Sequence, residues 1–126
     1  FGKLIFISGQ LPFEKKKLKF TGKIDTELSS EEAKQAVYLS TNNLLWNLND
    51  AIDKFKINRV RCINLKGYFN STQTFKNHSV LFDLSSNLLI KVLGKINGTH
   101  SRSVIGVSSL PKESPVEIDG IFGILD

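Results

Sequence analysis

The sequence predicts an α+β protein in which two helices cover one face of a mixed sheet. Two long segments, 29–55 and 75–93, carry apolar residues at helical spacing, and the segments around them have the apolar runs or polar alternation of strands. The expected order along the chain is β, β, α, β, α, β, β. Because both helices are expected on the same side, the other face of the sheet is expected to meet either solvent or another subunit.

The composition is that of one folded domain spanning residues 1–126. A hydrophobic content of 40% with nine phenylalanines excludes a disordered chain, and no apolar run reaches membrane-spanning length, so we expect no membrane partner. The single cysteine, Cys62, excludes an intrachain disulfide and fits a reducing, cytoplasmic compartment. The chain starts at Phe1 and contains no methionine, so we expect the native start, and any organelle-targeting peptide, to precede it.

The N-terminal segment predicts two short extended pieces around a basic loop. Leu4–Ile7 is rich in β-forming residues and is followed by Ser8 and Gly9, where a glycine permits close backbone approach. Four lysines in 14–19 account for much of the net charge of +5 and predict an exposed loop, followed by an extended piece at Phe20. No RNA-binding motif accompanies these lysines, so nucleic acid is not the expected partner.

Both helices have recognisable ends. Ser29 and Glu32 form a capping-box pattern before the first helix, and Gly94 is a stop signal after the second, which is predicted over Phe75–Leu93. We expect residues 96–99 to be a loop. The apolar stripe of the second helix is predicted at Val80, Leu81, Leu84, Leu88 and Val92.

The segment 57–69 between the helices predicts a strand with two unlike faces. One face is expected to meet the helices and the other to face solvent or another subunit. The helix-facing set is Ile63, Leu65 and Phe69, and the other set is Cys62, Asn64, Lys66 and Tyr68.

The last quarter of the chain, 100–111 and 115–122, predicts two strands joined by a turn with two prolines, forming a two-strand unit that closes the sheet. Alternation places Arg102 on one face with Val104, and Glu117 on the polar face of the second strand. A guanidinium and a carboxylate suggest a cleft that clamps a small acid and activates water. The residues alone leave open a solvated face or a simple ion pair.

Motifs at both ends of the chain resemble one family. Arg102-Ser103-Val104, Leu110-Pro111 and Val116-Glu117-Ile118 are similar to the C-terminal signature of the RidA family, also called YjgF or endoribonuclease L-PSP, and Ile7–Pro12 resembles its "SGQ-P" segment. Internal segments resemble a longer variant branch. The resemblance implies a chorismate-mutase-like fold and a homotrimer with one cleft at each subunit boundary.

The resemblance also implies a chemistry that needs neither metal nor cofactor. In the family, an arginine at the position of Arg102 holds the carboxylate of a small 2-imino or enamino acid, and water attacks the imine carbon to release ammonia and a 2-keto acid. Glu117 matches the acidic residue near that water, and Ser8 and Gly9 match the pocket wall. Arg102 and Glu117 are therefore the expected catalytic residues.

Two positions depart from the family pattern. Val104 stands where many members have cysteine, so no thiol is expected in the pocket, and Asp83 stands in place of an asparagine on the second helix. Both are expected substrate-binding positions. A carboxylate at Asp83 would repel an acidic substrate.

Two other functions remain as alternatives. The first is a trimeric binding or regulatory protein in which Arg102 holds a keto or amino acid without turnover. The second is an endoribonuclease or translation inhibitor, but His78 and His100 have no histidine partner in the pattern and form no recognisable metal site.

Overall fold

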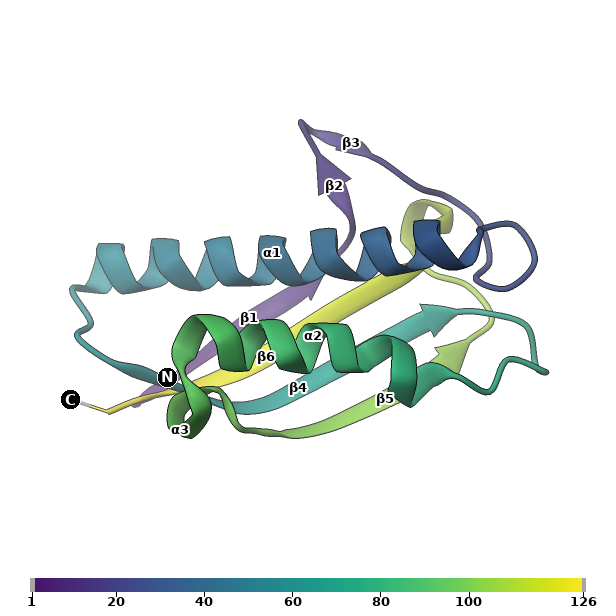
Figure 1. The fold of residues 1–126 in the computed structure, drawn as a ribbon. Helices are drawn as coiled ribbons and strands as arrows, with labels where there is room; N and C mark the ends of the chain where they lie inside the picture. Colours follow the sequence, from purple (N-terminus) through teal and green to yellow (C-terminus); the bar gives the residue numbers. More distant parts are fainter. Residues whose placement is uncertain (1, 126) are drawn as a thin grey trace.

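The computed structural model describes residues 2–125. It has the α+β composition predicted from the sequence, with one mixed sheet and helices packed on it (Figure 1). The elements in chain order are β1 (Leu4–Gln10), β2 (Phe13–Glu14), β3 (Lys17–Leu18), α1 (Ser30–Phe55), β4 (Val60–Asn70), α2 (His78–Leu93), α3 (Lys95–Gly98), β5 (Ser101–Val107), the 3-10 turn η1 (Pro111–Glu113) and β6 (Val116–Ile124).

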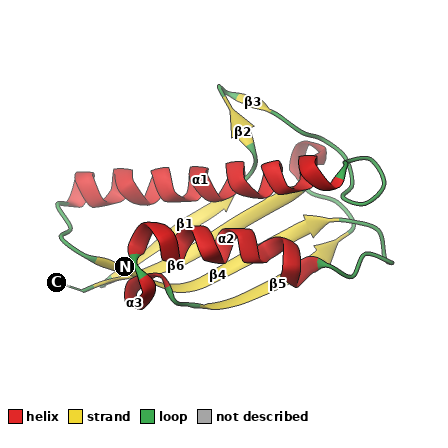
Figure 2. Cartoon of the chain, viewed as in Figure 1, coloured by secondary structure: helices red, strands yellow, loops and turns green. Residues whose placement is uncertain are grey.

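The main sheet has the strand order β1-β6-β4-β5. β6 runs antiparallel to both of its neighbours, whereas β5 is parallel to β4. A parallel pair needs a long crossover connection, and α2 provides it. Helices α1 and α2 lie side by side on the same face of the sheet, which confirms the predicted layer arrangement and leaves the opposite face uncovered (Figure 2). We call these the covered face and the open face.

The predicted pairing of the last two strands is wrong. β5 and β6 are not neighbours, because β4 lies between them and pairs with both. The connection crosses the end of β4, where the backbone N–H of Asn70 donates to the Pro115 carbonyl at 2.9 Å and that of Ser71 donates to the Val107 carbonyl at 3.3 Å. The prolines correctly marked a break between strands, but a break does not determine which strand lies next to which.

Helix α1 begins as its sequence predicts. Ser29 is the N-cap, its side chain accepts from the Glu32 backbone N–H, and the Glu32 side chain accepts from the Ser29 backbone N–H. The buried side of α1 forms much of the core against β1 and β6. Its buried residues are Ala33, Ala36, Val37, Ser40, Thr41, Leu44 and Leu48.

Helix α2 ends at Gly94 as predicted but begins at His78, later than the predicted Phe75. Its buried residues are Phe82, Ser85 and Leu89, so the helix is rotated relative to the predicted stripe, and Val80 is 70% exposed. One cause is a buried polar contact with α1. The hydroxyls of Thr41 and Ser85 are 2.7 Å apart, which requires Ser85 to face α1.

Two short segments also differ from prediction. The expected loop after α2 contains the single-turn helix α3, and Phe20 lies outside every strand. Instead, the short strands β2 and β3 form a small hairpin around the turn residues Lys15 and Lys16, which both have positive φ. This backbone conformation is that of a tight hairpin turn.

A register shift in β4 changes the predicted faces. Cys62 pairs with Phe122 and Asn64 pairs with the adjacent Ile121, so β4 carries one extra residue. Cys62 is therefore buried on the covered face and Ile63 is exposed, opposite to the prediction. Beyond the shift the prediction is confirmed: Leu65 and Phe69 are fully buried, and Lys66 and Tyr68 remain partly exposed.

Candidate functional site

Arg102 lies near the start of the edge strand β5 and reaches toward α2. It pairs in register with Leu65, a fully buried residue of the covered face, so its side chain leaves the sheet on the helix side. The guanidinium stands over the Phe82 ring at 5.4 Å, and its side chain is 26% exposed. Arg102 is thus held between the sheet edge and the first turns of α2.

Three polar contacts fix the orientation of the guanidinium. Arg102 Nη2 forms an ion pair with Asp83 Oδ1 at 2.8 Å and donates to the Ser79 carbonyl at 3.3 Å, and Nη1 donates to Ser86 Oγ at 3.1 Å. Contacts to an ionised partner are the stronger type of hydrogen bond. The structure therefore brings together Arg102 and Asp83, two of the residues expected in the site, as partners of each other.

The polar network continues to His100. Its Nδ1 lies against the Gly98 carbonyl, which only accepts, so the ring proton is on Nδ1. Nε2 of a neutral ring is then an acceptor and receives the Ser86 hydroxyl proton over 3.0 Å. His100 thereby fixes the Ser86 hydroxyl with its lone pairs toward Arg102. Sequence reasoning missed Ser79, Ser86 and this role of His100, because the three are joined only by the packing of α2 on β5.

Glu117 and Asp119 lie on the open face of β6. Their register partners on β4 are Tyr68 and Lys66, which also face away from the helices. Tyr68 donates its hydroxyl proton to Asp119 Oδ2 over 3.2 Å. Burial, followed by the neighbouring Asp119 and Glu117 carboxylates, raises the pKa of Tyr68 above its ordinary value, because each of them disfavours a phenolate.

Gly9 packs directly against Glu117. A side chain at position 9 would overlap the Glu117 carboxyl group, so the glycine leaves the room that this carboxyl occupies. Ser8 and Gly9 also line a shallow cavity of about 300 Å³ on the open face, together with Phe6, Lys66 and Asp119. The structure thus brings together three of the expected site residues, Ser8, Gly9 and Glu117.

The expected site residues fall into two groups on opposite faces of the sheet. Arg102, Val104 and Asp83 are on the side of the helices, with Val104 packed against the core beside Gly67. Ser8, Gly9 and Glu117 are on the open face. Within a single chain, Arg102 and Glu117 therefore do not meet.

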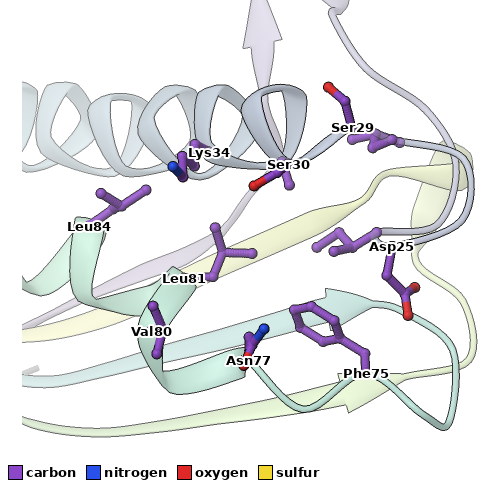
Figure 3. Close-up of a pocket in the computed structure, with 12 residues that line it drawn as sticks. Asp25, Ser29, Ser30, Lys34, Phe75, Asn77, Val80, Leu81 and Leu84 are labelled. Carbon is purple, nitrogen blue, oxygen red and sulfur yellow. The ribbon is translucent and has the colours of Figure 1, made fainter.

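The largest of three described cavities is a groove of about 650 Å³ between the first turns of α1 and α2 (Figure 3). Phe75, Leu81 and Leu84 give it apolar walls, and Asp25 and Lys34 lie at its rim. None of the residues expected in the site lines this groove. No pattern in the sequence indicates this groove, because it forms where two helices far apart in the chain come together.

A second cavity, of about 600 Å³, lies at the carboxyl ends of β4 and β5 and is lined by His78, Ser71 and Gly106. The His78 ring stacks on Phe69 with centroids 6.2 Å apart, and its Nε2 is buried beside Gly106, with no hydrogen-bond partner among residues 2–125. His78 and His100 thus occupy separate environments and do not form an acid–base pair for RNA cleavage. Within residues 2–125, Arg102 lines none of these three cavities.

Cys62 is a packed thiol, as its apolar surroundings in the sequence predict. It is 1% exposed, and burial raises its pKa to about 12, which disfavours the nucleophilic thiolate. Among the described residues, no group of three or more His, Cys, Asp or Glu side chains is placed to hold a metal ion. No helix in this part of the chain combines the length and the apolar character needed to cross a membrane.

Comparison with known proteins gives concordant matches. A family model described as YjgF/chorismate mutase-like, putative endoribonuclease matches residues 1–120. The crystal structure of Atu1372, a protein of unknown function from Agrobacterium tumefaciens, is 36% identical, with 98% of this chain and 77% of that chain covered and a TM-score of 0.87. The protein TCP17 of Trypanosoma cruzi is 28% identical over 121 residues, which cover 95% of this chain and 74% of that protein.

Two further structures extend the comparison. A putative endoribonuclease from Shewanella oneidensis is 27% identical, with 99% of this chain and 81% of that chain covered and a TM-score of 0.87. The YjgF gene product of Escherichia coli shares 16% identity and a TM-score of 0.62, with 99% and 83% covered, and therefore shows a common fold alone.

Proposed function

Because this chain belongs to the YjgF/chorismate mutase-like, putative endoribonuclease family, we propose that it hydrolyses small 2-imino acids, or their enamine forms, to 2-keto acids and ammonia. The family match agrees with the resemblance of the two terminal motifs to RidA, and the shared α+β fold agrees with the predicted chorismate-mutase-like architecture. The active form that we propose is a homotrimer with one site at each subunit boundary.

The observation that carries this proposal is the placement of Arg102 and Glu117 on opposite faces of one sheet. A site that uses both side chains has to take them from different copies, with Arg102 at the sheet edge of one copy and Glu117 on the open face of the next. In a closed ring each copy contributes both faces, so such sites are equivalent.

The open face is suited to such an assembly. Phe6, Ile63 and Ile105 on it are 60%, 43% and 51% exposed, although each strand also carries polar residues there. Apolar residues interspersed with polar ones are typical of a subunit interface, and an exposed sheet face of this size is unusual for an isolated domain.

The proposed chemistry assigns a separate task to each group. Arg102 binds the substrate carboxylate through guanidinium N–H donors, and its contacts with Ser79 and Ser86 keep it oriented before substrate arrives. Glu117 of the neighbouring copy accepts a proton from water as the oxygen bonds to the imine carbon, and returns that proton to the nitrogen. The carbinolamine then loses ammonia, which leaves the 2-keto acid.

One observation favours a second function, binding of a small acid without turnover. The Asp83 carboxylate already occupies part of the Arg102 guanidinium at 2.8 Å, so a substrate carboxylate has to share or displace it. A site with weakened attraction for its substrate suits a sensor of abundant keto or amino acids better than a scavenger of scarce imines.

Complementation between two inactive variants tests the shared site. Arg102→Ala and Glu117→Gln are each expected to lower kcat/KM for imine hydrolysis by about 100-fold, because the first loses the charge-assisted hydrogen bonds to the substrate carboxylate and the second loses the base that takes the proton from water. When the two variants are mixed, unfolded and refolded together, mixed trimers regain some sites with both native residues, and about a quarter of wild-type activity returns. Ammonia release from freshly generated 2-aminoacrylate is the measurement.

The controls separate the two candidate functions. Each variant refolded alone has to remain trimeric and inactive. If activity returns only when the variants are mixed, a catalytic site shared between copies is supported. If mixing restores no activity, both residues act in the same site of one chain, which contradicts the proposal. Wild-type protein that binds pyruvate but does not accelerate ammonia release supports the binding function instead.

A further inference from the structure

We infer that Asp83 makes this site selective for imino acids whose side chain carries a positive charge; the inference rests on the proposed function and names its substrate class. Asp83 lies on α2 with its side chain 57% exposed, more than twice the exposure of Arg102, so it is the outer member of the ion pair. Any ligand that approaches the guanidinium past this outer member meets the Asp83 carboxylate.

Asp83 offsets the positive charge of Arg102. Arg102 Nη2 and Asp83 Oδ1 are 2.8 Å apart, so at neutral pH the two side chains together carry no net charge. A monoanionic 2-imino acid with an apolar side chain therefore gains little long-range attraction from this site. A substrate with a cationic side chain gains a second short-range contact instead, because its cation faces Asp83 while its carboxylate faces Arg102.

The contacts within the chain use most of the N–H donors of Arg102. A guanidinium has five N–H groups, and the two on Nη2 point at Asp83 and Ser79 while one on Nη1 points at Ser86. The remaining N–H groups, on Nε and Nη1, do not form the fork that binds a carboxylate in a bidentate manner. A substrate carboxylate is thus held by fewer contacts, and binding energy has to come from another part of the substrate.

The ion pair with Arg102 uses only one of the two carboxylate oxygens of Asp83. Within residues 2–125 the structure gives Asp83 one partner, Arg102, which contacts Oδ1, so Oδ2 remains available as an acceptor on an exposed side chain. A guanidinium or ammonium at the end of a substrate side chain would donate to it. Such a charge-assisted contact favours the cationic substrate by about 10- to 100-fold over an uncharged one of equal length.

The test compares two substrates that share a three-carbon side chain, of which only one ends in a cationic guanidinium. An amino-acid oxidase generates the imines of arginine and of norvaline, which share the same three-carbon chain, and kcat/KM for their hydrolysis is measured with wild-type protein, Asp83→Asn and Asp53→Asn. Asp53→Asn is the matched control, since it removes an exposed carboxylate at the far end of α1. Binding of the two corresponding keto acids is measured in parallel by calorimetry.

We expect wild-type protein and Asp53→Asn to prefer the arginine-derived imine and its keto acid by at least about 10-fold, and Asp83→Asn to lose that preference. Hydrolysis without any preference for the charged side chain would overturn the role of Asp83 and leave the proposed function intact. Preferential binding that depends on Asp83, without hydrolysis, would support the inference and refute the catalytic function. Equal binding of both keto acids without hydrolysis would refute both.

Discussion

The two faces of the sheet use the same strands for different purposes. On the covered face, Leu65, Phe69 and Phe122 are fully buried beneath α1 and α2. The open face carries the exposed side chains of Phe6 and Ile63 as well as the Tyr68–Asp119 pair and Glu117. The covered face thus resembles the interior of any stable domain, whereas the open face mixes exposed apolar area with fixed charges.

This difference separates stability from function within one sheet. Side chains on the covered face stabilise the chain by themselves, because their apolar area is removed from water as the chain folds. Side chains on the open face remain accessible in the single chain, so their effect depends on what binds there. Substitutions on the covered face are expected to change unfolding, and substitutions on the open face to change association and ionisation.

The largest effect is expected from Phe122→Ala on the covered face. Phe122 is fully buried, and truncation leaves a cavity between β6 and the helices, which lowers the free energy of unfolding by about 3–5 kcal/mol. Urea denaturation followed by circular dichroism measures this loss. Phe6→Ala on the open face is the comparison, with a change within about 0.5 kcal/mol at protein concentrations below assembly. Similar losses for both variants would contradict the distinction between the faces.

The next effect concerns association through the open face. Phe6→Ser removes an exposed aromatic ring, and we expect the proposed trimer to dissociate at a protein concentration at least about 10-fold higher than wild type, because less apolar area is buried on assembly. Phe55→Ser is the matched control, since Phe55 is 66% exposed but lies at the end of α1. Sedimentation equilibrium measures both variants. A monomeric wild-type protein, or equal weakening by both substitutions, would argue against an interface at the open face.

The smallest effect concerns the ionisation of Tyr68, one of the two tyrosines of the chain. The pKa of Tyr68 is raised by burial and by the Asp119 and Glu117 carboxylates, so it keeps its proton as pH rises through the ordinary tyrosine range. Its neutral form is favoured in the folded state, and the associated stability is present below the unfolded pKa and is lost as pH rises through the folded value. Phenolate absorbance of Tyr68→Phe and Tyr38→Phe separates the two titrations.

Asp119→Asn provides the check on that assignment. Removing this carboxylate is expected to lower the pKa of Tyr68 toward its usual value, because both the nearby charge and the hydrogen bond to Asp119 Oδ2 disfavour the phenolate. A Tyr68 titration that does not respond to Asp119→Asn would show that burial and Glu117 set its pKa without Asp119.

Much of the candidate site was predictable from two short motifs, but its geometry was not. The sequence singled out Arg102, Glu117, Ser8 and Gly9 by resemblance, and the structure places Gly9 against Glu117. The sequence could not show that Arg102 and Glu117 lie on opposite faces of the sheet, because the direction of Arg102 depends on the pairing of β5 with β4. Asp83 was expected near the substrate as a repelling charge, and the structure places it on Arg102 as an ion-pair partner.

Features that depend on near neighbours in the chain could be predicted without the fold. The capping box of Ser29 and Glu32 predicted the start of α1, and Gly94 predicted the end of α2. The alternation of apolar and polar residues predicted the strands. These signals act over a few residues, so they can be recognised without knowing the fold.

Which distant segments lie next to each other could be seen in the fold alone. In the fold, β4 lies between β5 and β6, and one extra residue in β4 places Cys62 in the core. Helix α2 is rotated so that Ser85 contacts Thr41. Strand pairing and helix rotation are set by contacts between residues far apart in the chain, where the burial of the whole core outweighs local preference. For the same reason, the separation of Arg102 from Glu117 becomes visible only in the folded chain.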